Sequence, residues 1–109
     1  MRQWLVDPKI MCRQHLLGEH VEHHMYVGTI QKGGNLTGFL EGNLLEPTSL
    51  RSRHDELVAE MIRRGYNHKS PLPEFRPFGH EHVVIDRAAS LSELLRRCPD
   101  CRQRYGEQA

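Results

Sequence analysis

Apolar residues recur at helical spacing along this chain, and the alternating pattern of a β-strand is almost absent. The clearest helix begins near Pro47 or Ser49 and closes on Arg63 and Arg64, with Gly65 as the residue that follows it. The positions at three- and four-residue spacing inside it are Leu50, His54, Leu57, Val58, Met61 and Ile62. A helix with one apolar stripe has to bury that stripe against other helices, so the pattern predicts an all-α fold.

A longer helix is expected ahead of this one. Asp7 and Pro8 combine an N-cap side chain with a proline at the first helical position, where its fixed φ helps and its missing N–H costs nothing. We therefore expect a helix from Pro8 to about Val27. Gly28 and the glycine-rich stretch 33–42 predict a loop after it.

A third helix is expected near the C-terminus. Prolines hold the segment 70–82 out of the helical region of backbone conformation. The next helix is predicted to start at Asp86 or Ser90, where Ser90 and Glu93 fit a capping box. It is predicted to end at Pro99, because proline breaks a helix interior.

Length and composition narrow the class of protein. The 109 residues suffice for one domain, so residues 1–109 are predicted to form a single small all-α domain of three main helices. No run approaches the ~20 apolar residues that a membrane span needs, and the N-terminus lacks the apolar core of a secretion signal. We expect a monomeric, cytoplasmic protein with no membrane partner. Three cysteines, an odd number, argue against a disulfide framework.

The basic residues are strongly biased in type. Twelve of the fifteen are arginine, the side chain suited to planar recognition of phosphates. Five arginines between Arg87 and Arg104 accompany only Glu93 and Asp100, which leaves a local surplus of three positive charges. The surplus favours a polyanionic partner, although a solvated helix face produces the same pattern.

The predicted first helix has two different faces. Helical spacing places four polar or aromatic residues on one of them: His15, Glu19, Glu22 and Tyr26. Another face holds Leu17, Val21, Met25 and Gly28. We expect the apolar face to pack and the polar face to carry chemistry.

The same helix is rich in histidine. It adds His20, His23 and His24 to His15. One hypothesis is a metal site built on His15, Glu19 and one more histidine, although the HExxH signature is missing. The alternative is a polar helix face with surface histidines.

Several polar motifs occur in a fixed order along the chain. They are CRQHLLGEHVE from Cys12, HDELVAEMIRRGYNHK from His54, LPEFRP from Leu72 and AASLSELLRR from Ala88. Together they resemble the motifs of the phage-type pyrimidine-dimer DNA glycosylase and abasic lyase family, the dimer-specific endonuclease V type. The resemblance covers about two thirds of the chain.

The resemblance implies a monomeric helical repair enzyme that acts on damaged double-stranded DNA and requires no cofactor. It assigns the catalytic glutamate to Glu22 and the nucleophile to the α-amine of Met1, with Arg2 matching the arginine that follows in the family. Gln14 and His15 match a glutamine and a histidine that orient groups or contact DNA. Because bulky Arg2 follows Met1, we expect the initiator methionine to be retained.

Elementary chemistry supports an amine nucleophile. An α-amine has a pKa near ~7.7, against ~10.4 for lysine, so it is substantially unprotonated at neutral pH. Attack on the sugar C1′ forms an iminium, and a carboxylate such as Glu22 can stabilise the developing positive charge and then accept a proton from C2′. The alternative for Glu22 is a solvent-exposed helix position.

Positive side chains along the second and third helices and the tail are candidate DNA contacts. They are Arg63, Arg64, Lys69, Arg96, Arg97, Arg102 and Arg104. Arg63 and Arg64 also suit a helix C-terminus, whose dipole favours cations. Where the family has DNA-contacting arginines on the first helix, this chain has Val21 and Met25. An abasic site or another lesion is therefore an alternative substrate to pyrimidine dimers.

The sequence CPDC at Cys98 to Cys101 is half of a zinc site. Cys12 plus His80 or His82 could complete it, and otherwise the pair is a reduced dithiol. A zinc ion here would be structural and would pin the tail to the first helix.

Two rival functions remain open at this point. One is a non-enzymatic helical nucleic-acid-binding module, stabilised by zinc, which the arginine bias and the CxxC pair favour. The other is a metal-dependent hydrolase built on the histidine-rich first helix. A chelator would abolish the hydrolase, whereas an amine mechanism does not need a metal.

Overall fold

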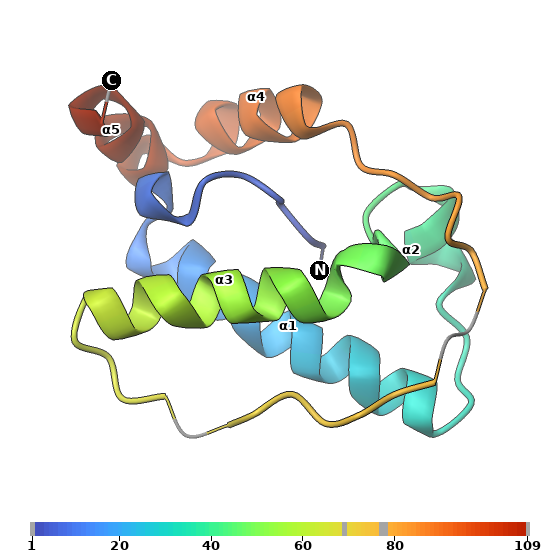
Figure 1. Cartoon of the computed structure of the whole chain (residues 1–109). Coiled ribbons are helices and arrows are strands. Elements are labelled where there is room, and N and C mark those ends of the chain that lie inside the picture. Colours follow the sequence, from blue (N-terminus) through green and yellow to red (C-terminus); the bar gives the residue numbers. More distant parts are fainter. Residues whose placement is uncertain (1, 69, 77–78, 109) are drawn as a thin grey trace.

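Helices α1 (Arg13–Gln31) and α3 (Leu50–Arg63) pack against each other at the centre of the fold (Figure 1). The computed structural model describes residues 2–68, 70–76 and 79–108. Its other elements are the short 3-10 turns η1 (Pro8–Ile10) and η2 (Pro47–Ser49) and the helices α2 (Thr37–Glu41), α4 (Arg87–Arg97) and α5 (Pro99–Gln108). No strand occurs in these ranges, so the all-α class is confirmed. None of the helices described is long and apolar enough to cross a bilayer.

Helix α1 starts five residues later than the sequence predicts. Asp7 does cap a proline-led turn, with its side chain accepting from the N–H of Lys9 at 3.0 Å, but this turn is η1 and ends at Ile10. The backbone is extended at Cys12, which then caps α1 through its sulfur. The guanidinium of Arg64 stabilises this break between η1 and α1 by donating to the carbonyl oxygens of Pro8 and Met11.

Two more helices appear where sequence analysis predicts none. The short α2 forms inside the glycine-rich stretch, and α5 begins at Pro99, just after α4 has ended at Arg97 as predicted. Of the two predicted starts of α4, Asp86 is confirmed, because it caps the helix by accepting from the N–H of Ala89 at 3.0 Å, and the capping box at Ser90 is not formed. Ser90 donates instead to the carbonyl oxygen of Trp4 at 2.5 Å. The described chain therefore has five α-helices and not three.

The extended N-terminal segment, residues 2–7, lies between the central helix pair and α4 (Figure 1). It contributes Trp4 and Val6 to a buried apolar cluster shared with η1, α1, α3, α4 and α5. A second apolar cluster surrounds Tyr26 and Leu40 near α2. The start of the chain is therefore a core element, held on both sides.

The two faces of α1 are oriented opposite to the prediction. Val21 and Met25 are 54% and 52% exposed, whereas Glu19, His23 and Tyr26 are almost completely buried. The inward polar groups are tolerable because two of them have partners: Glu19 pairs with an arginine and His23 with a glutamine. The prediction failed because the burial of polar groups depends on partners far away in the sequence.

The buried ion pair between Glu19 and Arg53 connects the central helices. Arg53 donates from Nε and Nη2 to both carboxylate oxygens at 2.7 and 3.0 Å, and the two side chains are at most 1% exposed. The same guanidinium donates to the carbonyl oxygen of Val6 at 2.6 Å and reaches the sulfur of Met11 at 3.4 Å. One side chain thus joins α1, α3 and the N-terminal segment.

Replacing Glu19 by Gln should lower the free energy of unfolding by about 3–5 kcal/mol, because the buried Arg53 charge loses its buried carboxylate partner. Urea denaturation at neutral pH measures the loss. Glu56→Gln is the matched control, since Glu56 also pairs with Arg53 but its side chain is 54% exposed. That change should cost less than about 1 kcal/mol. Equal losses in the two variants would contradict the assignment.

Candidate active site

The carboxylate of Glu22 binds the main chain at Arg2. Its Oε2 accepts a hydrogen bond from the main-chain N–H of Arg2 at 2.9 Å. Glu22 lies in the middle of α1 and is half-buried. Met1, the predicted nucleophile, lies outside the described residues, but its neighbour in the chain is fixed against this carboxylate.

Gln3 anchors the segment that leads to Glu22. Its main-chain N–H donates to the carbonyl oxygen of Leu44 at 2.8 Å, and its side chain is completely buried. The Gln3 amide donates from Nε2 to His23 Nε2 at 3.0 Å, while Oε1 accepts from the N–H of Glu46 at 2.5 Å. His23 Nδ1 lies 2.8 Å from the carbonyl oxygen of Glu19, to which it donates as a neutral ring. Burial lowers the pKa of His23, which favours this neutral form.

The Arg2 side chain contacts α4 and the Trp4 ring. Its Nη2 donates to Ser90 Oγ on α4 at 2.9 Å, and its guanidinium carbon lies 4.3 Å from the centre of the Trp4 ring. Burial lowers the pKa of Arg2, and the positive charge of Arg97 acts in the same direction. The site is therefore bordered by cations from the N-terminal segment and from α4.

Burial also changes the acid–base groups facing the start of the chain. It raises the pKa of Glu22, against the opposing effect of the Arg2 N–H. It raises the pKa of Tyr26 as well, and the Tyr26 hydroxyl is buried with no hydrogen-bond partner. A half-buried carboxylate with a raised pKa is suited to accept a proton.

Sequence reasoning proposed Glu22 and Arg2, which the structure brings together, but it missed the residues that position them. Gln3, His23 and Ser90 hold the N-terminal segment in place. The available signal was a glutamine inside the otherwise apolar stretch that follows Arg2, although nothing local identifies its partners.

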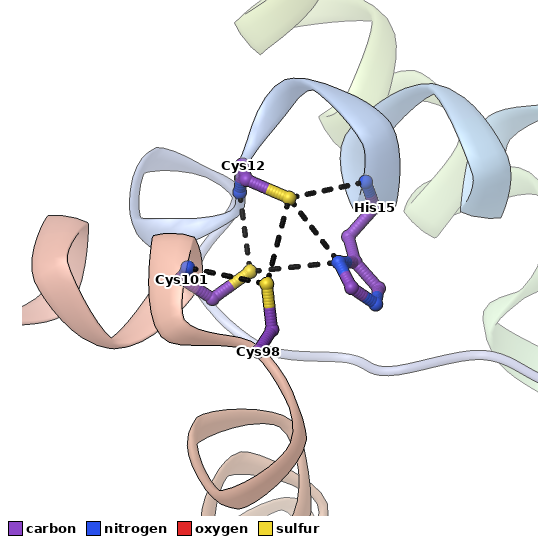
Figure 2. Close-up of side chains that lie close together, drawn as sticks. All are labelled: Cys12, His15, Cys98 and Cys101. Atoms are coloured by element: carbon purple, nitrogen blue, oxygen red, sulfur yellow. Dashed lines mark hydrogen bonds between the residues drawn. The ribbon is translucent and has the colours of Figure 1, made fainter.

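Gln14 and His15 do not share the surroundings of Glu22. Gln14 is exposed at the first turn of α1. His15 points at sulfur atoms, with its Nδ1 at 3.2 Å from Cys12 Sγ and 3.7 Å from Cys101 Sγ (Figure 2).

Four side chains form a cysteine–histidine cluster: Cys12, His15, Cys98 and Cys101 (Figure 2). The sequence hypothesis had the three cysteines together but looked for the histidine at His80 or His82. Those two histidines are exposed in the loop before α4 and do not join the cluster. The fourth member is His15, three residues from Cys12 and thus one helical turn away.

The predicted first-helix metal site is also arranged differently. A four-histidine cluster forms from His20, His24, His54 and His68. It joins α1 to α3 and to the segment that follows α3. It contains neither His15 nor Glu19, because Glu19 is occupied by Arg53.

The predicted DNA-contacting arginines differ in how freely they can reach a ligand. Arg63, Arg96, Arg97 and Arg102 are exposed, and the first three pair with Glu60 or Glu93 on the same helix face. Arg64 has only 10% of its side chain exposed and supports the chain break before α1. Arg104 donates to the carbonyl oxygen of Lys9 at 2.9 Å, and Lys69 lies outside the described residues.

Replacing Glu22 by Gln should not lower the free energy of unfolding at pH 7. The amide keeps an oxygen that can accept from Arg2, and it removes a charge that burial disfavours. Chemical denaturation of the variant and the parent protein gives the difference. A loss above about 1 kcal/mol would show that Glu22 stabilises the fold. It would contradict the expectation that Glu22 costs stability and is kept for its function.

Comparison with known proteins bears on the same region. The family model for pyrimidine dimer DNA glycosylase matches residues 1–74, which include Arg2 and Glu22 but end before Cys98 and Cys101. No curated protein and no solved structure matches the chain. Because the matched span is more than half of the 109 residues, this chain belongs to the pyrimidine dimer DNA glycosylase family.

Proposed function

We propose that this protein is a DNA glycosylase with abasic lyase activity whose nucleophile is the N-terminal α-amine and whose carboxylate partner is Glu22. The observation that carries the proposal is the 2.9 Å hydrogen bond from the Arg2 N–H to Glu22 Oε2. It holds the residue next to the amine against a half-buried carboxylate. The proposed substrate is damaged double-stranded DNA, bound by a monomer.

The reaction starts with the neutral amine attacking the sugar C1′. A C–N bond forms, the glycosidic bond breaks, and the base leaves with the bonding electrons. Loss of a proton from the nitrogen and opening of the sugar ring give an iminium. Glu22 then accepts a proton from C2′, and the electrons of that C–H bond expel the 3′ phosphate. The raised pKa of Glu22 makes it a better acceptor for this proton than an exposed glutamate.

Cations beside the site favour the neutral amine. A carboxylate alone would raise the pKa of the amine and leave more of it protonated. Arg2 is one of these cations, and the positive charge of Arg97 is near enough to lower the pKa of Arg2. Both positive charges oppose the effect of Glu22.

The exposed arginines of α4 give the site a route to the phosphate backbone. Arg96 and Arg97 follow Ser90 by two helical turns on the helix that borders Arg2, and both are exposed. Contacts of this kind neutralise phosphates without reading sequence. The exposed Val21 and Met25 on α1 offer an apolar surface instead of charge, which suits an unstacked sugar or base more than a phosphate. This favours an abasic site or another extrahelical lesion as a substrate alongside pyrimidine dimers.

Borohydride trapping tests the proposal directly. Duplexes carrying one thymine dimer, one abasic site or no lesion are incubated with the protein and a chelator, and the covalent adduct is mapped by mass spectrometry. We expect an adduct with a damaged duplex, located on residue 1 and on none of the three lysines. Acetylation of the amine should abolish it, and Glu22→Gln should reduce strand cleavage about 10²–10⁴-fold.

The control is Glu56→Gln, which makes the same chemical change at an exposed position of α3. It should leave trapping and cleavage unchanged. An adduct on the abasic duplex alone would keep the mechanism and restrict the substrate. Binding to DNA with no adduct on any duplex would overturn the enzyme in favour of a binding module. Activity that the chelator abolishes while the protein remains folded would favour a metal-dependent hydrolase.

A further inference from the structure

The cysteine–histidine cluster has the dimensions of a tetrahedral metal site. Its four ligand atoms all lie within 4.8 Å of one another. Cys12 Sγ is 3.8 Å from Cys98 Sγ and 3.2 Å from His15 Nδ1, which is 3.7 Å from Cys101 Sγ (Figure 2). Zinc bonds of about 2.3 Å to sulfur and 2.0–2.1 Å to nitrogen would separate tetrahedral ligand atoms by about 3.5–3.8 Å.

Backbone N–H groups point at all three sulfur atoms of the cluster. All three cysteines are buried and free of disulfides. Each sulfur accepts a backbone N–H: Cys12 from His15 at 3.5 Å, Cys101 from Cys12 at 3.2 Å and Cys98 from Cys101 at 3.4 Å. Such bonds stabilise negative charge on sulfur, and three charges this close together require a cation.

We propose that Cys12, His15, Cys98 and Cys101 bind a structural Zn²⁺ ion. The set supplies four protein ligands of the Cys₃His type and leaves no position open for substrate, as in structural zinc sites. Two ligands come from the start of α1 and two from the junction of α4 and α5. The ion would therefore cross-link the two ends of the domain, one of which lies beyond the matched part of the family.

Metal analysis and cobalt substitution test this site. Untagged protein should contain zinc that a strong chelator removes with a drop in melting temperature. Co²⁺ should produce the thiolate-to-cobalt charge-transfer band in the wild-type protein, and Cys101→Ser should lose it. His15→Gln should weaken Co²⁺ binding at this band, whereas His82→Gln, at an exposed histidine outside the cluster, should not.

Purified protein with no bound metal and no charge-transfer band on Co²⁺ addition would overturn the zinc site. So would a band of undiminished intensity in Cys101→Ser. Both readouts use the wild-type protein or a spectrum, so they do not depend on the trapping experiment. Failure of the zinc site therefore leaves the amine mechanism standing, and the reverse also holds.

The four-histidine cluster carries a second inference on separate observations. The Nε2 atoms of His24 and His54 are buried without a hydrogen-bond partner. The Nδ1 of His54 lies 3.1 Å from the carboxylate of Asp55, and donating to it leaves Nε2 as a bare lone pair. The Nε2 atoms of His20 and His68 lie 3.0 Å apart, so at most one of the two carries a proton.

The four rings bring their nitrogen atoms close together. One ligand atom from each of the four residues lies within 4.8 Å of the others. A carboxylate that orients a histidine through its other nitrogen is the usual support of a metal ligand, and Asp55 has this position for His54.

We infer that His20, His24, His54 and His68 bind a second divalent transition-metal ion, with Zn²⁺ and Co²⁺ as the probes. Neutral imidazoles suit first-row metals of this class. The ion would join α1 and α3 to the segment after α3.

Titration of the metal-free protein with Co²⁺ separates the two sites. The wild-type protein should bind two equivalents. His54→Gln should bind one and keep the full thiolate band, whereas Cys101→Ser should bind one and lose the band. Saturation of the wild-type protein at one equivalent, or two equivalents retained in His54→Gln, would overturn the histidine site without affecting the zinc site.

Discussion

The buried ion pair of Glu19 and Arg53 holds in place the elements that form the candidate active site. Besides Glu56 on its own helix, its guanidinium donates to the Glu19 carboxylate, the Val6 carbonyl oxygen and the Met11 sulfur, which are far from Arg53 in the chain. Glu19 precedes Glu22 by nearly one helical turn, so the same contact that places the N-terminal segment also sets the rotation of α1. Buried ion pairs contribute little net stability but tolerate few alternative arrangements. Here the arrangement brings Arg2 to Glu22.

Polar groups in the core explain why α1 was the hardest element to orient from sequence. An amphipathic helix is oriented by assuming that its apolar stripe faces inward. In this protein Val21 and Met25 face solvent, while Glu19 and His23 are buried with partners at positions 53 and 3. Such partners are separated by 34 and 20 residues, and no local pattern reveals them. The inward face of α1 therefore carries polar residues that are tolerated only because they have such partners, since an unpaired charge in a core is costly.

The predictable parts are those that local chemistry determines. The helix at 50–63 follows from its apolar spacing, and Gly65 takes a φ of +85° after it, a conformation that glycine adopts without strain. The position of Glu22 opposite the start of the chain followed from a family resemblance and not from spacing. The break at Cys12, helix α5 and the surroundings of His15 could not be predicted, since they depend on contacts between the two ends of the chain.

The Trp4 ring lies between the cysteine–histidine cluster and the candidate active site. The Trp4 ring lies 4.3 Å from the Arg2 guanidinium and 5.9 Å from the His15 ring, edge to face. The Trp4 carbonyl oxygen accepts from Ser90 on α4, which also binds Arg2. A metal cross-link between Cys12 and the α4–α5 junction would therefore help to hold α4 against the N-terminal segment. Helix α4 lies outside the matched family segment, yet its Ser90 binds Arg2, the residue whose N–H donates to Glu22.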